Sequence, residues 1–491
     1  DDQTKLKPQV YLDRYLVIGS VAAKSIAVYD LEAEKPLAIL KDVPQSDLMS
    51  EVILTADAAH VIQLNSDGQF FIHEISGGRL ALSGRVVDDE IIIYTPEGYY
   101  WASYEGAHFV QLRFPGLPGL YPFQQFASVL DRPDIISARL KLGAAAPPPP
   151  ALVPPPTVDI DRRGIVVDPE RIELNVNIRS GEPLAHLRFY ADGLRIDDET
   201  LEGLKASRQI SLPRPANARW LSAQAADVNG LVSKPEAIRL SASANKTNVL
   251  RAVVVGISAY GNLKLRLNFA RSDAERLGAA LGANAGHYYA RSEVTSLLDG
   301  AATKDAVLSA LKRAVVEASA TDTLVFSFAG HGVQGPDRRY YLTPVDFDLH
   351  RIVDTGLAWT DVASVLQASK ARVIVILDSC HAGLTGAQEL GTNDDAVAAL
   401  LSGAHAPMLV LAATKGRQLS YEGGRWGGGV FTSALIKAIQ SERSSYDLDR
   451  NGAIEASELY YALKSIVVGE TAGMQTPWLV RQDLLGDFAL F

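Results

Sequence analysis

The stretch Arg372–Gly383, RVIVILDSCHAG, contains the only cysteine of the chain and decides its fold. Val373–Leu377 is an unbroken apolar run rich in β-branched residues, which is typical of a central strand buried on both faces. The run ends at Asp378-Ser379-Cys380, where polar residues mark the carboxyl end of the strand. Open α/β sheets place their active sites at this edge.

A second buried strand, Thr323–Phe328 (TLVFSF), is followed by Ala329-Gly330-His331-Gly332. Because parallel strands end at the same edge, we expect His331 and Cys380 to lie close together. A thiolate attacks a carbonyl, and a nearby imidazole takes the thiol proton and returns it to the leaving amine. The backbone N–H groups of Gly332 and Cys380 are candidate donors to the oxyanion. In the alternative interpretation, Cys380 is a small buried hydrophobe and His331 a core histidine.

The segment from about Val249 to Phe491 resembles the caspase-like cysteine peptidases, on the side of the metacaspases and bacterial orthocaspases. This resemblance implies a cysteine endopeptidase with a caspase-like fold. The animal caspase signature around the cysteine is absent, so specificity for aspartate is not implied. The matching motifs are AVVVGIS at 252–258, LNFARSDA at 267–274, FSFAGHG at 326–332, VILDSCHAG at 375–383, LAAT at 411–414, GGVFTSAL at 428–435 and QTPWL at 475–479.

Two carboxylates are candidates for the specificity pocket. In metacaspases, the aspartates at the motif positions that Asp273 and Asp378 match line a pocket for a basic side chain. The resemblance therefore implies cleavage after Arg or Lys, and two carboxylates in a partly dry cleft would favour Arg first. For Asp273 there is an alternative role, as a carboxylate that stabilises the amino terminus of a helix.

Residues 447–458 match the EF-hand calcium loop. Oxygen ligands at alternate positions surround a hard cation, and a glycine permits the sharp turn. A single hand without a partner leaves two interpretations open, a Ca²⁺ site or a turn kept for structure alone. The predicted ligands are Asp447, Asp449, Asn451, the carbonyl of Ala453, and Glu458 with both oxygens.

Length and composition predict a globular protein with several domains. A chain of 491 residues is too long for one core, so two to four domains are expected. No apolar run is long enough to span a membrane. A net charge of −10 without a dense Lys/Arg cluster argues against nucleic acid as a partner. The sequence begins at Asp1 rather than Met, so a cytoplasmic protein and a periplasmic or secreted one that has lost a signal peptide both stay open.

The front half is predicted to be rich in β-structure. Residues 1–142 are predicted to form short strands. Two similar stretches begin at Tyr15 and His60, and their spacing of about 45 residues resembles that of WD40-type β-propeller blades. Too few blades are present to close a ring, so this region is either a truncated propeller or an open remnant. The Pro-rich stretch 143–156 predicts a stiff linker. Residues 157–245 show about seven short strands, typical of an immunoglobulin-like sandwich.

From residue 246 to 491 strands alternate with helices, which predicts a mostly parallel sheet covered by helices on both faces. The sequence thus favours a cysteine endopeptidase that cleaves protein or peptide substrates after Arg or Lys. Its β-rich front half would regulate it or bind a protein partner. The alternative is a catalytically inactive caspase-like scaffold for protein interactions, and the intact His331/Cys380 pair favours the enzyme.

Overall fold

The computed structural model shows two compact units, one comprising Asp1–Pro156 with Ser180–Leu184 and Ala226–Lys234, the other Thr157–Arg179, Ala185–Ala225 and Pro235–Phe491. The residues that it describes are 6–87, 90–103, 106–117, 120–143, 146–149, 151–168, 170–215, 218–240, 247–284, 288–379, 407–414, 420–448, 450, 452–482, 484–485 and 488–491. None of the described helices combines the length and the apolar character that crossing a bilayer requires.

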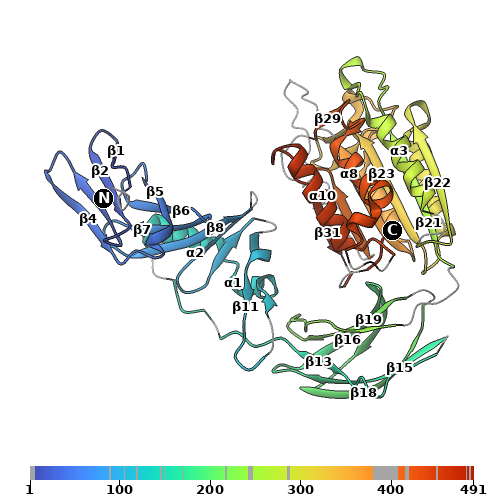
Figure 1. Ribbon diagram of the computed structural model, residues 1–491, viewed down its shortest axis with the longest axis horizontal. Helices are drawn as coiled ribbons and strands as arrows, with labels where there is room; N and C mark the ends of the chain where they lie inside the picture. The colour runs from blue at the N-terminus through green and yellow to red at the C-terminus, as the bar shows by residue number, and fades with distance from the viewer. Residues whose placement is uncertain are drawn as a thin grey trace. The chain divides into compact units, whose positions relative to one another are not determined.

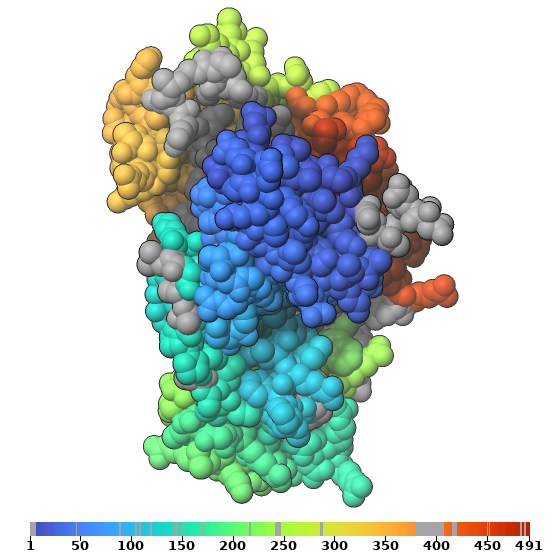
Figure 2. Space-filling model, turned by 90° about the vertical axis from the view of Figure 1, so that its left-hand side faces the viewer, coloured from blue at the N-terminus to red at the C-terminus, as the bar shows by residue number. Residues whose placement is uncertain are grey.

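The described part of the first unit contains a four-stranded and a six-stranded antiparallel sheet, in which strands that follow one another in sequence pair (Figure 1), and a two-stranded sheet of β11 (Gln111–Leu112) and β12 (Tyr121–Pro122). Figure 2 shows part of their surface in blue. The two similar stretches of sequence form β2 to β4 and β6 to β8, and their assignment to propeller blades stays a prediction. The first sheet has the order β1 (Gln9–Tyr11), β2 (Tyr15–Ser20), β3 (Ser25–Asp30), β4 (Lys35–Lys41). The second consists of β5 (Met49–Leu54), β6 (His60–Asn65), β7 (Gln69–Glu74), β8 (Leu80–Val87), β9 (Glu90–Tyr94) and β10 (Tyr100–Ala102).

A helix interrupts the β-structure of this unit where only short strands were predicted. Helix α2 (Pro133–Leu142) begins with proline at its first turn and is followed by Gly143 in the left-handed conformation, with φ of 59°. These are ordinary start and stop signals for a helix. Ile136 and Leu140 pack against apolar residues of the second sheet. The prediction was wrong here because tertiary burial and the two caps select a helix for this short segment.

The Pro-rich segment contains neither helix nor strand at residues 146–149 and 151–156. Leu152 nevertheless packs against a cluster of buried aromatic side chains that includes Tyr100 and Phe123. The rings of these two residues have their centroids 4.4 Å apart. The segment is therefore in contact with its own unit at this position.

The second unit begins with two four-stranded antiparallel sheets. Burial alternates along the long strand β15, so that one of its faces points inward. The described residues between 157 and 240 form eight strands where about seven were expected, and the immunoglobulin-like assignment stays a prediction. One sheet consists of β13 (Thr157–Ile160), β14 (Val166–Val167), β15 (Arg171–Arg179) and β18 (Lys205–Pro213), and the other of β16 (Leu184–Ala191), β17 (Leu194–Thr200), β19 (Trp220–Asp227) and β20 (Glu236–Arg239).

The rest of this unit is built on a six-stranded sheet, β22-β21-β23-β27-β28-β31 (Figure 1). The pairings from β22 through β28 are parallel, and β31 is antiparallel to β28. This is the mostly parallel arrangement that the alternation of strands and helices predicts. The bounds are β21 (Val249–Gly256), β22 (Arg291–Leu298), β23 (Thr323–Gly330), β27 (Arg372–Ser379), β28 (Met408–Ala412) and β31 (Trp478–Gln482).

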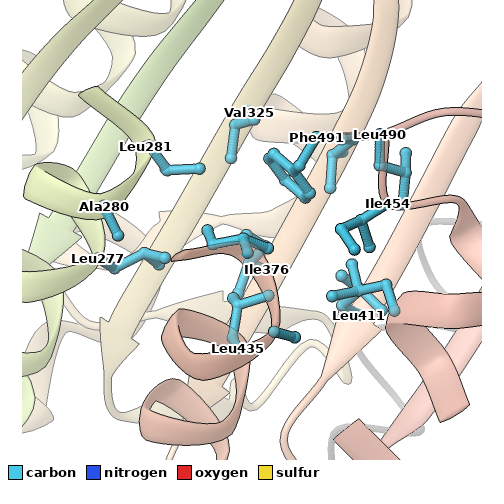
Figure 3. Packing of buried hydrophobic residues seen from close by; sticks show 14 of the residues in the cluster. Leu277, Ala280, Leu281, Val325, Ile376, Leu411, Leu435, Ile454, Leu490 and Phe491 are labelled. Carbon is cyan, nitrogen blue, oxygen red and sulfur yellow. The ribbon is translucent and has the colours of Figure 1, made fainter. Parts of the chain in front are cut away.

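Apolar residues that alternate along the strands divide between two cores, one on each face of the sheet. Ile374 and Ile376 point to the face covered by α3 (Ala270–Ala283), α8 (Val430–Ile436) and α10 (Ala456–Glu470), and Figure 3 shows part of this packing. Val373 and Val375 point to the face covered by α4 (Lys304–Glu317) and α6 (Trp359–Gln367). Burial on both faces explains why the strands are continuously apolar.

The four-stranded sheet that contains β16 and β17 and the six-stranded sheet are in direct contact within the second unit. The turn between β16 and β17 approaches the last residues of the chain, where the Leu485 N–H donates to the carbonyl of Gly193 at 3.2 Å. A Cβ on Gly193 would lie 2.4 Å from Cδ1 of Phe488, so only glycine permits this approach. The same turn lies at the start of strand β27, where Arg372 donates to the carbonyl of Asp192 at 3.2 Å.

Candidate active site

His331 lies immediately after β23 and is 2 % exposed. Its Nε2 is 2.9 Å from the carbonyl oxygen of Leu265. Because a carbonyl only accepts, Nε2 carries the hydrogen, and Nδ1 is the basic nitrogen of the neutral ring. The His331 N–H donates to the Tyr260 hydroxyl at 3.2 Å, and the Thr343 N–H and Oγ1 each donate to the His331 carbonyl at 3.0 Å. His331 is thus held by buried hydrogen bonds on several sides.

The register between β23 and β27 relates His331 to the predicted nucleophile. Gly330 is paired with Ser379 in parallel register, and each is followed directly by one of the two predicted catalytic residues. Cys380 itself lies outside the described residues. The described backbone therefore places Ser379, the residue before Cys380, beside Gly330, the residue before His331.

Gly332 opens the short strand β24 (Gly332–Gln334), which pairs with β25 (Tyr340–Leu342). A Cβ at Gly332 would lie 1.8 Å from the Tyr340 hydroxyl, a clash that excludes any larger residue without rearrangement. The glycine in this motif is therefore required by packing as well as by its predicted oxyanion role. That role involves Cys380 also and stays a prediction.

The two predicted pocket carboxylates converge on one glycine. Asp273 lies in the first turn of α3 and Asp378 lies near the end of β27, and both are buried. A Cβ on Gly429, in the short strand β30 (Gly428–Gly429), would lie 3.2 Å from an Oδ2 atom of each aspartate. The Gly429 N–H donates to Asp273 Oδ2 at 2.9 Å. Glycine at this position leaves room for two carboxylates to approach each other.

Burial and mutual repulsion raise the pKa of these carboxylates. For Asp378, burial is the largest cause and the negative charge of Asp273 comes next, and together they raise its pKa to about 6. Its oxygens accept hydrogen bonds from Ser420 Oγ at 3.0 Å and from Thr432 Oγ1 at 2.7 Å. Burial also raises the pKa of Asp273, against the lowering effects of Arg276 and of the Gly429 N–H. Buried like charges with perturbed pKa values are typical of functional sites.

A third carboxylate, Glu422, belongs to this site and was missed from the sequence. It lies in β29 (Glu422–Gly423), where it pairs directly with Gly429. Burial and the nearby charge of Asp273 raise the pKa of Glu422. Asn268 Nδ2 donates to its Oε1 at 3.4 Å. A two-residue hairpin strand has no periodicity, so no sequence pattern indicated that Glu422 faces the two aspartates.

The predicted calcium loop is described only in part, because Asp449 and Asn451 lie outside the described residues. The Gly452 N–H donates to Asp447 Oδ2 at 2.9 Å. Both oxygens of Glu458 accept backbone N–H groups, from Leu448 and Glu455, the second as part of the capping box of α10. The described carboxylates thus face the loop, as a calcium ion requires, but their hydrogen bonds also close the loop. No cluster of three or more His, Cys, Asp or Glu side chains suited to a metal ion occurs in the described part of the chain.

The site thus combines a histidine that follows β23 with a buried aspartate near the end of the neighbouring strand β27 and a second buried aspartate in the helix that follows β21. The profile of the caspase domain, peptidase C14, matches residues 250–489. Residues 250–489 are therefore similar to a caspase domain, and this match supports a caspase-like peptidase of the metacaspase type. Curated relatives of the chain include Metacaspase-1 of Ajellomyces capsulatus (strain NAm1 / WU24), 31% identical over 156 residues, which make up 28% of this chain and 42% of that protein.

Metacaspase-1A of Aspergillus terreus (strain NIH 2624 / FGSC A1156) is 30% identical over 152 residues, covering 28% of this chain and 36% of that protein. The chain thus spans less than half the length of these curated relatives. A crystal structure of a Geobacter sulfurreducens protein is 21% identical and covers 48% of this chain and 93% of that chain, with a TM-score of 0.35. A score this low does not establish a shared fold.

Proposed function

We propose that this protein is a cysteine endopeptidase that cleaves protein or peptide substrates after Arg or Lys. His331 and Cys380 form the catalytic pair, and Asp273 and Asp378, joined by Glu422, bind the basic side chain before the scissile bond. The β-rich front half regulates the enzyme or binds a protein partner. The observation that carries the proposal is the convergence of two buried aspartates on Gly429, next to the strand end that carries His331.

The hydrogen bonding of His331 supports its role as the base. Since Nε2 donates to the Leu265 carbonyl, Nδ1 is the basic nitrogen of the ring, and in this proposal it takes the thiol proton of Cys380. The thiolate attacks the scissile carbonyl, and the N–H groups of Gly332 and Cys380 donate to the oxyanion. The imidazolium then gives its proton to the departing amine, and water hydrolyses the thioester with His331 again as base.

The pocket supports selection for a cation. A guanidinium or ammonium group would satisfy the charges of Asp378 and Glu422, which receive neutral hydrogen-bond donors in the described structure. A substrate with Asp at this position would add a fourth carboxylate to a buried acidic site, and repulsion would exclude it.

Calcium binding at 447–458 is also a proposal, supported by the ligand spacing and by carboxylates that face the loop. Asp447, Asp449, Asn451, the Ala453 carbonyl and Glu458 would hold the ion. Since hydrogen bonds already close the loop, bound calcium would add stability there and supply no chemistry to the reaction.

Peptide substrates that vary only in the residue before the cut test the proposal. We expect cleavage after Arg and Lys, none after Asp, and a loss on the order of a thousandfold or more in Cys380→Ala and His331→Ala. Circular dichroism checks that these variants stay folded. Turnover by Cys380→Ala at the wild-type rate would overturn the proposed mechanism, and a folded wild-type protein that cleaves nothing would favour the inactive scaffold.

A further inference from the structure

The acidic pocket contains a cation of its own. Arg276 lies one turn after Asp273 on α3, and its Nη2 is 2.6 Å from Asp273 Oδ1. The same nitrogen donates to Ser433 Oγ at 3.2 Å, and Ser433 in turn donates to the Trp426 carbonyl at 2.8 Å. The Arg276 side chain is 35% exposed, whereas that of Asp273 is only 5% exposed.

Glycines in the β29–β30 hairpin make this ion pair fit. A Cβ on Gly428 would lie 2.0 Å from Asp273 Oδ1 and 2.6 Å from Arg276 Nη2. A Cβ on Gly427 would lie 3.6 Å from Arg276 Nη1. The hairpin backbone therefore lies directly over the ion pair, which distinguishes it from a freely solvated pair on a helix surface.

The three carboxylates of the pocket differ in their partners. Asp273 has the guanidinium of Arg276 and the Gly429 N–H. The described contacts of Asp378 come from two hydroxyl groups, and that of Glu422 from an amide. The negative charge of Asp273 is thus compensated within the chain, whereas those of Asp378 and Glu422 are met by neutral donors.

We propose that Arg276 is a specificity-determining residue that sets the net charge of the pocket. It compensates Asp273 and leaves Asp378 and Glu422 to bind the basic side chain of the substrate. This inference rests on the proposed function. The described charged groups that face Asp273 are Arg276 from its own helix, Asp378 from β27 and Glu422 from β29. With both remaining carboxylates ionised, three negative charges and one positive charge leave a net charge of about −2.

Replacing Arg276 with Gln should change substrate binding in opposite directions at high and low pH. At pH 8.5 to 9, where the carboxylates are ionised, the uncompensated Asp273 makes the pocket more negative, and KM for an Arg substrate should fall about threefold. At lower pH, the added repulsion makes the carboxylates hold a proton more strongly. The acid limb of kcat/KM should therefore move up by about one pH unit.

The experiment compares KM and kcat from pH 5.5 to 9 for wild type, Arg276→Gln and Arg271→Gln. Arg271 is the matched control, because it lies on the same helix but pairs with Asp299, at 3.1 Å, away from the pocket. We expect the 1/KM profiles of wild type and Arg276→Gln to cross, with kcat at pH 8.5 unchanged within about twofold, and we expect Arg271→Gln to follow wild type. Arg276→Lys should restore the wild-type profile in large part, because it keeps the charge.

Profiles of Arg276→Gln that overlay wild type, or that fall below it at every pH, would overturn the inference, since a purely structural ion pair gives one of these results. If wild type itself fails to cleave Arg or Lys substrates, the proposed function fails first. The two failures are therefore distinguishable.

Discussion

Strand β27 has a buried charged residue near each of its ends, and the groups that surround the two charges differ. Arg372, the first residue of the strand, is 4% exposed, and Asp378, the residue before its last, is 6% exposed. At the start of the strand the charge is surrounded by fixed partners. At the end of the strand, like charges and glycines surround it.

Around Arg372, the guanidinium donates to the Asp192 carbonyl at 3.2 Å and to Thr323 Oγ1 at 3.3 Å. Its carbon lies 4.9 Å from the ring centroid of Phe488, at a distance that suits a cation–π contact. Asp192 in turn accepts the backbone N–H groups of Arg219 and Trp220. These contacts join the turn between β16 and β17 to the six-stranded sheet, and a buried charge with such partners is structural.

Around Asp378, the described charges that raise its pKa are Asp273 and Glu422, both negative. Repulsion at this end raises the free energy of the folded protein, and it would be relieved by a bound cation. A buried charge that lacks compensation inside the fold indicates a ligand site, whereas a compensated one indicates a structural role. Four predictions follow from this difference, and they are ordered by the size of the expected effect.

Asp378→Asn should separate activity from stability. We expect kcat/KM for Arg substrates to fall on the order of a hundredfold or more, because a neutral amide cannot pair with the guanidinium. Burial raises the folded pKa of Asp378 to about 6, so the stability that this group contributes is present below its unfolded pKa and is lost as the pH rises through about 6. At pH 8 the Asn variant should therefore unfold in urea at no lower concentration than wild type. Marked destabilisation at pH 8 would show that Asp378 is structural, like Arg372.

Arg372→Met should have the converse effect. The methionine fills part of the same space but leaves the Asp192 carbonyl and Thr323 without their donor, and we expect a loss of about 3 kcal/mol in the free energy of unfolding. Urea unfolding of the full chain measures it. Specificity for Arg over other residues should not change in the variant that stays folded, and a changed preference would contradict the contrast between the two ends.

The pH dependence of substrate binding tests the proposed role of Asp378, near the end of β27, directly. Since Asp378 must be ionised to bind a cation, 1/KM for an Arg substrate should fall about tenfold per pH unit below pH 6. Steady-state kinetics from pH 5 to 8 check this. This fall in 1/KM below pH 6 should be absent from the residual activity of Asp378→Asn. If 1/KM of that variant falls below pH 6 as in wild type, the fall is caused by the titration of another group.

Calcium should increase the stability of the region near Arg372, at the start of β27. The loop at 447–458 is joined to the residues near Arg372, because the Ile454 N–H donates to the Phe491 carbonyl at 2.7 Å and the Ala456 N–H donates to the Phe488 carbonyl at 3.1 Å. We expect millimolar calcium to raise the Tm by a few degrees, about 1 kcal/mol or more in stability, with KM unchanged. Glu458→Gln should lose this shift. A Tm that calcium leaves unchanged would make the loop structural alone.

The absence of basic residues after the nucleophile gives a last expectation. Residues 381–407 contain no Lys or Arg, so an enzyme that requires a basic residue cannot cut itself there. We therefore expect activity from the chain uncut in this segment. Mass spectrometry of the incubated enzyme checks it, with Cys380→Ala as the control. A cut within 381–407 that depends on Cys380 would refute the specificity for Arg and Lys.

The sequence by itself determined the α/β fold of the second half and the strand ends that carry His331 and Asp378. Buried parallel strands are continuously apolar, and helices show their own period, so local pattern suffices to find them. Helix capping is a local signal of the same kind, and at the start of α4 the Thr303 Oγ1 accepts the Ala306 N–H.

Tertiary structure alone decided which further charges meet Asp273 and which partner Arg372 has. Glu422 faces Asp273 across 149 positions of sequence (422 − 273), through a hairpin too short to have a pattern. Arg276 reaches Asp273 beneath the glycines of that hairpin, and Arg372 finds its partner at Asp192, 180 positions away. Hydrophobic periodicity reports whether a residue is buried, but not what it is buried against. The electrostatics that distinguish a structural charge from a functional one depend on those neighbours, and only the folded chain brings them together.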